Sequence, residues 1–167
     1  MSNLGYFRFP TINKNHLVFV CEDDLWSYDI PDKKLSRLTS NHGPVMTPKI
    51  SPDGKNIAFV GTDDGDMEVY VMSALGGPAK RLTYFGSVML KVIGWKNNNE
   101  ILFSSNHGMP FVRMSDIYSV NIKGEYPTCL SFGMGNDIAL TDNGVVLGKN
   151  TSDPARWKRY KGGTAGE

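Results

Sequence analysis

The feature that most constrains this chain is a fourfold repeat of apolar runs within its 167 residues. The runs are rich in branched and aromatic residues and read HLVFVC from residue 16, NIAFVG from 56, EILFSS from 100 and GVVLGK from 144. Their starts are 40, 44 and 44 residues apart. A repeat of roughly 40 to 45 residues is the period of a β-propeller blade.

A turn signal stands before each apolar run: TINKNH, ISPDGK, WKNNNE and LTDNGV. Asn, Asp and Gly supply the positive φ angles and local side-chain hydrogen bonds that tight hairpins need. Each run is therefore predicted to form a hairpin with the segment before it, and these segments read FRFPTI, VMTPKIS, LKVIGW and DIALT.

Two further strands are predicted after each of the first three runs. The third strands read DLWSYD, EVYVMS and DIYSVN, and the fourth read LSRLTS, AKRLTY and PTCLSF. Two registers repeat through these units, one with Leu38, Leu82 and Leu130, the other with Trp26, Tyr70 and Tyr118. The second register is typical of aromatic packing between blades.

The sequence thus predicts an all-β fold of four-stranded antiparallel propeller blades, with about three and a half blades over residues 1–167. Blade 1 is expected at about 6–40, blade 2 at 44–84, blade 3 at 89–132 and a partial blade 4 at 136–167. No stretch has useful helical periodicity. Because blades lean on their neighbours, this number leaves open sheet edges, and we expect an incomplete propeller.

Composition excludes several classes of protein. Hydrophobic residues make up 40% of the chain and the net charge is +1, which disfavours disorder and a general polyanion-binding surface. No apolar run is long enough for a membrane span and no secretory leader is visible, so a cytoplasmic protein is expected. Cys21 and Cys129 lack metal or redox spacing and are predicted to be buried free thiols.

Other polar clusters favour structural roles. Glu22-Asp23-Asp24 and Asp63-Asp64-Gly65-Asp66 fall at equivalent turns and lack the ligand spacing of a calcium loop. His16, His42 and His107 each follow an Asn and are expected to be solvated turn or loop residues. No metal, no cofactor and no nucleophile motif of the G-x-S-x-G type is predicted.

The basic segment DPARWKRYKGGTAGE at 153–167 is the best candidate for a functional surface. Arg156, Lys158 and Arg159 alternate with aromatic residues there, a pattern also found in nucleic-acid patches. Three interpretations remain open: solvated loop charges, contact with further domains of the same chain, and contact with a peptide. Nucleic-acid binding is disfavoured because the basic character is local.

The motifs FVCEDDLWSYD, SPDGKNIAFVG, EVYVM…GG…RLTYFG and DPARWKRYKGGTAGE give the chain its resemblance to a known family. It resembles the N-terminal six-bladed propeller of the tricorn protease family. The resemblance implies part of a large cytosolic serine peptidase that assembles into hexamers and degrades oligopeptides, with propeller channels guiding substrate or product. The family's catalytic residues lie outside this segment, so no catalytic residue is assigned within 1–167.

Some archaeal relatives carry an arginine pair, after the strand matching RLTYF, that anchors the substrate carboxylate. This chain has no such pair there, and Lys91 is the substitute candidate, without the bidentate fork of arginine. The resemblance implies that the chain acts as a gate and scaffold for the peptidase, in contact with the other domains. The alternative is a stand-alone propeller that binds proteins or peptides without enzymatic activity.

Overall fold

The computed structural model describes residues 5–40, 43–63 and 65–149, and every regular element in these ranges is a β-strand. The first sheet contains β1 (Phe7–Asn13), β2 (His16–Cys21), β3 (Asp24–Asp29) and β4 (Lys34–Arg37). The second contains β5 (Met46–Ile50), β6 (Asn56–Gly61), β7 (Glu68–Ser73) and β8 (Lys80–Arg81). The third contains β9 (Leu90–Asn97), β10 (Glu100–Ser105), β11 (Asp116–Asn121) and β12 (Thr128–Cys129).

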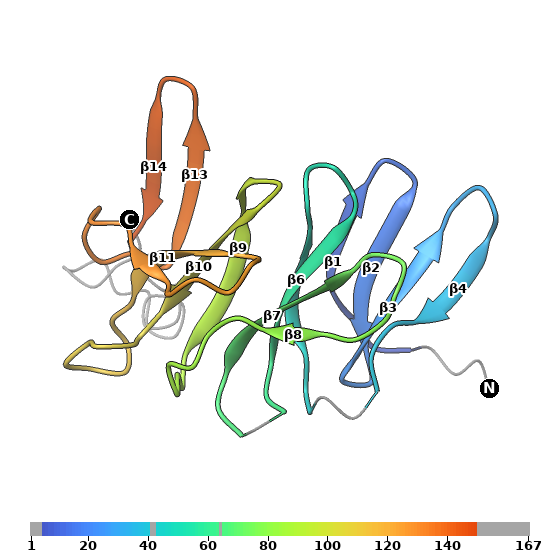
Figure 1. Ribbon diagram of the computed structural model, residues 1–167, viewed down its shortest axis with the longest axis horizontal. Helices are drawn as coiled ribbons and strands as arrows, with labels where there is room; N and C mark the ends of the chain where they lie inside the picture. Colours follow the sequence, from blue (N-terminus) through green and yellow to red (C-terminus); the bar gives the residue numbers. More distant parts are fainter. Residues whose placement is uncertain (1–4, 41–42, 64, 150–167) are drawn as a thin grey trace, which may run out of the picture.

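Each of these sheets runs antiparallel in chain order, and a hairpin of β13 (Asp137–Thr141) and β14 (Gly144–Gly148) follows them. The sheets stand in a row and the β13–β14 hairpin projects from the far end (Figure 1). The described residues therefore form three four-stranded blades and half of a fourth. The predicted all-β, incomplete propeller is confirmed.

The hairpin turns follow from their sequences. In SPDG, the Ser51 hydroxyl donates to Asp53 Oδ1 at 2.6 Å, and the amide of Lys55 donates to the same oxygen at 3.1 Å. Gly54 takes a φ of 77°, which a side chain would strain. The Ser51 hydrogen bond is the main cause that lowers the pKa of Asp53 below its usual 3.8.

The first strands of blades 1 and 2 carry a bulge at matching places. The register of β1 shifts between Arg8 and Thr11, and that of β5 between Met46 and Lys49. Within each shift lies a residue of positive φ followed by proline, Phe9-Pro10 in β1 and Thr47-Pro48 in β5. Proline lacks an amide donor and is tolerated in edge strands and bulges, so these strands suit the edge of their sheets.

The hydrophobic core lies between the sheets. Ile57 and Phe59 of β6 face blade 1, whereas Ala58 and Val60 face blade 3. Strand side chains alternate between faces, so a strand buried on both sides reads as an unbroken apolar run. Equivalent stacks lie within blades 2 and 3, where Phe59 meets Tyr70 at 5.7 Å and Phe103 meets Tyr118 at 5.5 Å between ring centroids.

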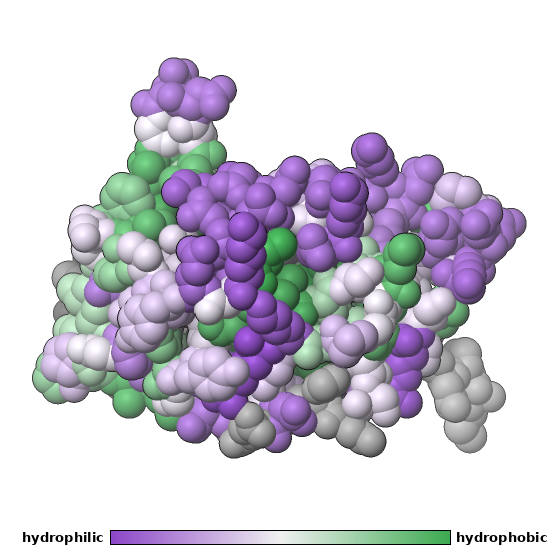
Figure 2. Space-filling view, in the orientation of Figure 1, coloured by the Kyte–Doolittle hydropathy of each residue, from purple (hydrophilic) through white to green (hydrophobic). Residues whose placement is uncertain are grey.

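The two ends of the row are less covered. An apolar cross-strand row crosses all four strands on the outer face of blade 1, through the register pairs that join Ile12, Leu17, Tyr28 and Leu35. These four residues, which we call the blade 1 row, are half-buried or exposed. At the other end, Figure 2 shows apolar surface along the projecting β13–β14 hairpin, and Val146 there is exposed.

The burial of the predicted aromatic and thiol side chains depends on where each one lies in the row of blades. Tyr70 and Tyr118 are buried as predicted, but Trp26 of blade 1 is only half-buried because no other sheet among the described residues packs on its face. Both cysteines are free, yet Cys21 is half-buried and Cys129 is exposed, so the prediction of two buried thiols is wrong. Cys129 lies on β12, the outer edge strand of blade 3, where little packs over it.

No helix long and apolar enough to span a membrane occurs among the residues that the structure describes.

Candidate functional site

The first strands of the blades form a shared inner edge. β1 lies against β5, β5 against β9, and β9 against β13. In a propeller the blades surround a central channel, so the edge that neighbouring blades share is the one that can line it. Equivalent residues of these first strands can be found from the strand register. In each blade we take the residue that pairs with the fifth position of the second strand (β2, β6, β10 or β14). These residues are Arg8, Met46, Lys91 and Asp137.

Lys91 lies at this inner edge and forms an ion pair. Its Nζ is 2.5 Å from Asp137 Oδ2 on β13, so the pair joins equivalent places in blade 3 and partial blade 4. Both side chains are about half exposed. The pair stabilises the arrangement of the two blades only modestly in such an exposed place. A peptide contact at Lys91 stays a prediction, and it would compete with Asp137.

Two further hydrogen bonds join the inner strands of blades 2 and 3. The Trp95 indole donates to the Lys49 carbonyl at 2.9 Å, and the amide of Val92 donates to the Thr47 hydroxyl at 3.1 Å. Thr47 is the positive-φ residue of the β5 bulge, so the bulge presents its hydroxyl to the next blade. These two hydrogen bonds fix the position of β9 relative to β5 at the inner edge.

The basic segment predicted as a contact surface lies outside the described residues. Arg156, Lys158 and Arg159 therefore keep their three interpretations.

A buried charge cluster in blade 2 is a feature that sequence reasoning missed. Glu68 at the start of β7 is only 1% exposed. It accepts hydrogen bonds from Arg81 Nη2 at 3.1 Å, from the Gly86 amide at 2.8 Å and from the Thr83 hydroxyl. The Thr83 hydroxyl in turn accepts from the Val69 amide at 2.8 Å. A buried carboxylate needs such a set of donors.

The same cluster recurs in blade 1 and is altered in blade 3. In blade 1, Arg37 and the Thr39 hydroxyl both donate to Asp24. In blade 3 the equivalent acid is Asp116, but Cys129 stands at the arginine position, opposite Tyr118 in the register. Desolvation of the sulfur raises the pKa of Cys129, and the Asp116 carboxylate adds to this effect.

The signal for these clusters is present in the sequence as a repeated Arg-Leu-Thr, at 37–39 and 81–83, with an acid at 24 and 68. The turn interpretation of Glu22-Asp23-Asp24 holds for the first two residues, which take positive φ angles between β2 and β3. Asp24 itself begins β3 and is buried.

His107 and His16 differ from the expected solvated turn or loop residues. His107 is half-buried, stacks on Phe85 at 3.8 Å between centroids, and its Nδ1 lies 3.3 Å from the Phe85 carbonyl. Its backbone carbonyl accepts a hydrogen bond from the Tyr118 hydroxyl at 3.0 Å. These contacts give His107 a packing role between blades 2 and 3. His16 begins β2, and His42 lies outside the described residues.

Within the described ranges, no three His, Cys, Asp or Glu side chains are grouped so that they could hold a metal ion.

Comparison with known proteins decides the family. Residues 4–167 match the profile of the tricorn protease N-terminal β-propeller domain. The chain belongs to the tricorn protease N-terminal propeller family. A tricorn-like protease N-terminal subunit of Sulfurisphaera tokodaii is 37% identical over 98% of this chain and 85% of its own length. A tricorn protease homolog of Saccharolobus solfataricus is 36% identical over 98% of this chain, which spans 15% of that relative.

Solved structures agree with the tricorn assignment. The crystal structure of the tricorn protease superposes with a TM-score of 0.82 at 29% identity, over 97% of this chain and 17% of that one. The propeller domain of the Trilobed protease from Pyrococcus furiosus superposes with a TM-score of 0.63 at 14% identity, which shows the fold alone. This tricorn propeller segment thus corresponds to a small part of the long tricorn proteases and to most of the S. tokodaii subunit.

Proposed function

We propose that this chain is the non-catalytic N-terminal propeller portion of a tricorn-type cytosolic serine peptidase that degrades oligopeptides. Its blades gate substrate or product and provide a scaffold for assembly. The observation that carries the proposal is the blade 1 row, an apolar sheet face on which none of the described sheets packs, in a chain of the tricorn propeller family.

The scaffold role rests on the contrast between the two faces of blade 1. Val18 and Val20, which face blade 2, are fully buried, whereas Leu35 of the blade 1 row is 56% exposed. Soluble proteins seldom leave a sheet face of this kind uncovered, and propeller blades cover such faces with the next blade. We infer that another sheet, carried by the rest of the peptidase, packs on the blade 1 row.

The gate role rests on the inner edge. Arg8 and the Lys91–Asp137 pair place charges at equivalent positions of three blades. Charged groups at a channel edge select among charged peptides by attraction and repulsion. The first strands supply this edge, and oligopeptides passing through the assembled channel would meet it.

Reconstitution tests the proposal. The chain, a separately expressed polypeptide with the remaining blades and the peptidase region, and an equimolar mixture of the two are each assayed for hydrolysis of a fluorogenic oligopeptide. We expect hydrolysis by the mixture and none by the chain alone. Hydrolysis by the chain alone, or activity of the other polypeptide that is unchanged by adding the chain, contradicts the proposal.

Leu35→Asp sharpens this test. A buried unpaired carboxylate at the sheet interface is costly, so we expect the concentration of chain needed for half-maximal activity to rise at least about tenfold. Val88→Asp is the matched control, because Val88 is 55% exposed in a loop away from the blade 1 row. Equal behaviour of the two variants contradicts packing on the blade 1 row.

A second function is considered because this chain covers 85% of a relative that is named a tricorn-like protease N-terminal subunit, so a propeller portion can be a subunit in its own right. In this alternative the chain is a stand-alone propeller module that binds proteins or peptides, and two or more copies close the open faces against each other. A chain that self-associates through Leu35 and does not bind the peptidase polypeptide supports this alternative over the first.

A further inference from the structure

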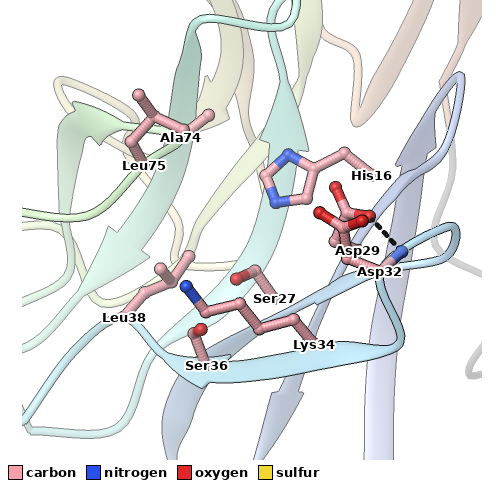
Figure 3. A pocket seen from close by; sticks show the side chains of 9 residues that line it. All are labelled: His16, Ser27, Asp29, Asp32, Lys34, Ser36, Leu38, Ala74 and Leu75. Carbon is pink, nitrogen blue, oxygen red and sulfur yellow. Dashed lines mark hydrogen bonds between the residues drawn. The ribbon is translucent and has the colours of Figure 1, made fainter.

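A cleft of about 350 Å³ opens between strands β2 to β4 of blade 1 and the turn that joins β7 to β8 in blade 2. Four ionisable side chains line it: His16, Asp29, Asp32 and Lys34 (Figure 3). None of its lining residues belongs to the first strand of a blade, so it is separate from the inner edge.

Strand register explains why these side chains share one face. His16 is the register partner of Asp29, and Asp29 is the register partner of Lys34, so the three form one row across β2, β3 and β4. Ser27 and Ser36 pair in a neighbouring row two residues along the strands. Because side chains alternate along a strand, both rows point to the same side, toward blade 2.

The polar groups of the cleft have few partners within the protein. Asp29 Oδ1 accepts the Asp32 amide at 3.0 Å. Beyond this bond, the side chains of His16, Asp32 and Lys34 make no ion pair or hydrogen bond among the described residues. Other charged side chains of the described residues pair with one another, as Glu68 does with Arg81 and Asp24 with Arg37. The cleft therefore presents donors and acceptors to solvent.

Charges of opposite sign lie at different ends of the cleft. In Figure 3 the carboxylates of Asp29 and Asp32 group beside His16, whereas the Lys34 ammonium extends away from them toward Leu38. Ser27 and Ser36 lie on the Lys34 side and can donate hydroxyl hydrogen bonds. Leu38, Ala74 and Leu75 supply apolar surface across the cleft.

We propose that this cleft binds a small zwitterion that carries an ammonium group and a carboxylate, as a free α-amino acid or a short peptide does. The ammonium binds Asp29 and Asp32, the carboxylate binds Lys34 and the serine hydroxyls, and an apolar side chain contacts Leu38 and Leu75. A ligand with one charge only leaves the charged groups at the other end of the cleft without a partner of opposite sign. The volume falls within the range of small-ligand pockets, about 300 to 1,000 Å³.

This inference rests on the proposed function only for the source of a peptide ligand, because binding at the cleft is measured directly on the protein. The probe is the dipeptide alanyl-leucine, titrated into the ¹⁵N-labelled chain and followed by amide chemical shifts. Comparison ligands are N-acetyl-alanyl-leucine, alanyl-leucinamide and free leucine. Each capped peptide lacks one of the two charges.

We expect saturable shifts confined to the cleft strands, and at least about tenfold weaker binding for each capped peptide, since each loses a charge-assisted hydrogen bond. Tighter binding of the dipeptide than of leucine identifies a peptide ligand, and the reverse identifies a free amino acid. Either result supports a zwitterion site. Absence of saturable shifts, or equal binding of the capped peptides, overturns it.

Lys34→Gln and Lys33→Gln provide a matched pair, because the two lysines are adjacent in one hairpin and only Lys34 lines the cleft. We expect Lys34→Gln to weaken dipeptide binding at least about tenfold and Lys33→Gln to leave it unchanged. Equal effects overturn the site. Neither residue belongs to the blade 1 row or the inner edge, so loss of dipeptide binding leaves reconstituted hydrolysis as a separate test of the proposed function.

Discussion

The buried Glu68–Arg81 pair gives the sharpest stability prediction. Arg81→Met removes the guanidinium that lies 3.1 Å from Glu68 Oε1 and leaves a carboxylate that is 1% exposed. Breaking a buried pair from one side costs about 3 to 5 kcal/mol, because the remaining charge stays buried. Here the Thr83 hydroxyl and the Gly86 amide still donate to Glu68, so the lower end applies.

The expected loss for Arg81→Met is therefore about 3 kcal/mol of the free energy of unfolding. This value includes the loss of the cation–π contact of Arg81 with Tyr84, 4.4 Å from the ring centroid, which contributes about 0.5 to 1 kcal/mol. Arg37→Met in blade 1 is the matched control. Arg37 is 50% exposed against 20% for Arg81, so water replaces the guanidinium and the expected loss is about 1 kcal/mol.

Urea unfolding followed by tryptophan fluorescence measures both variants. In the Arg81→Met background, Glu68→Gln removes the buried charge and is expected to recover about 1 to 2 kcal/mol. Losses below about 1 kcal/mol for both arginine variants, or no recovery in the double variant, would refute the claim that burial of Glu68 makes this cluster important.

Two further predictions concern single blades. Cys129→Arg places beside Asp116 the arginine that blades 1 and 2 carry. Urea unfolding should show a free energy of unfolding that is higher by about 0.5 kcal/mol, as for an exposed ion pair. A lower free energy of unfolding than that of the unsubstituted chain contradicts the equivalence of the three clusters. Ser51→Ala should raise the pKa of Asp53 toward 3.8 in an NMR titration, since the Ser51 hydroxyl is the main cause of its lowering. The stability that Asp53 contributes is present above its unfolded pKa and is lost as pH falls through the lower folded pKa. Ser51→Ala should therefore reduce the loss of unfolding free energy at acidic pH. An unchanged pKa of Asp53 contradicts the claim that the Ser51 hydroxyl is the main cause of its lowering.

The fold was predictable because the information for it is local and repeated. The turn SPDG and its counterparts mark each hairpin, and the unbroken run at 56–61 indicates a strand buried on both faces. Four repeats of one pattern leave little choice of architecture. The first and last residues of each blade, as given from the sequence, stay a prediction.

The sites were less predictable because they depend on contacts between distant residues. Glu68 reads as one charge in an alternating strand, and its burial requires Arg81 and Gly86 from the following segment. The cleft depends on the register that aligns His16 with Asp29 and Lys34, which spacing alone does not reveal. The exposure of Cys129 follows from its place on an edge strand, whereas cysteine is usually buried.

Sedimentation velocity of the chain, alone and mixed with a separately expressed polypeptide that contains the remaining blades and the peptidase region, tests the central claim most directly. The claim is that the open face of blade 1 packs against further sheets of a tricorn-type peptidase. We predict that the mixture sediments as one heavier species, and that Leu35→Asp returns the chain to its own boundary while Val88→Asp does not. Two independent boundaries for the unsubstituted mixture would contradict the claim.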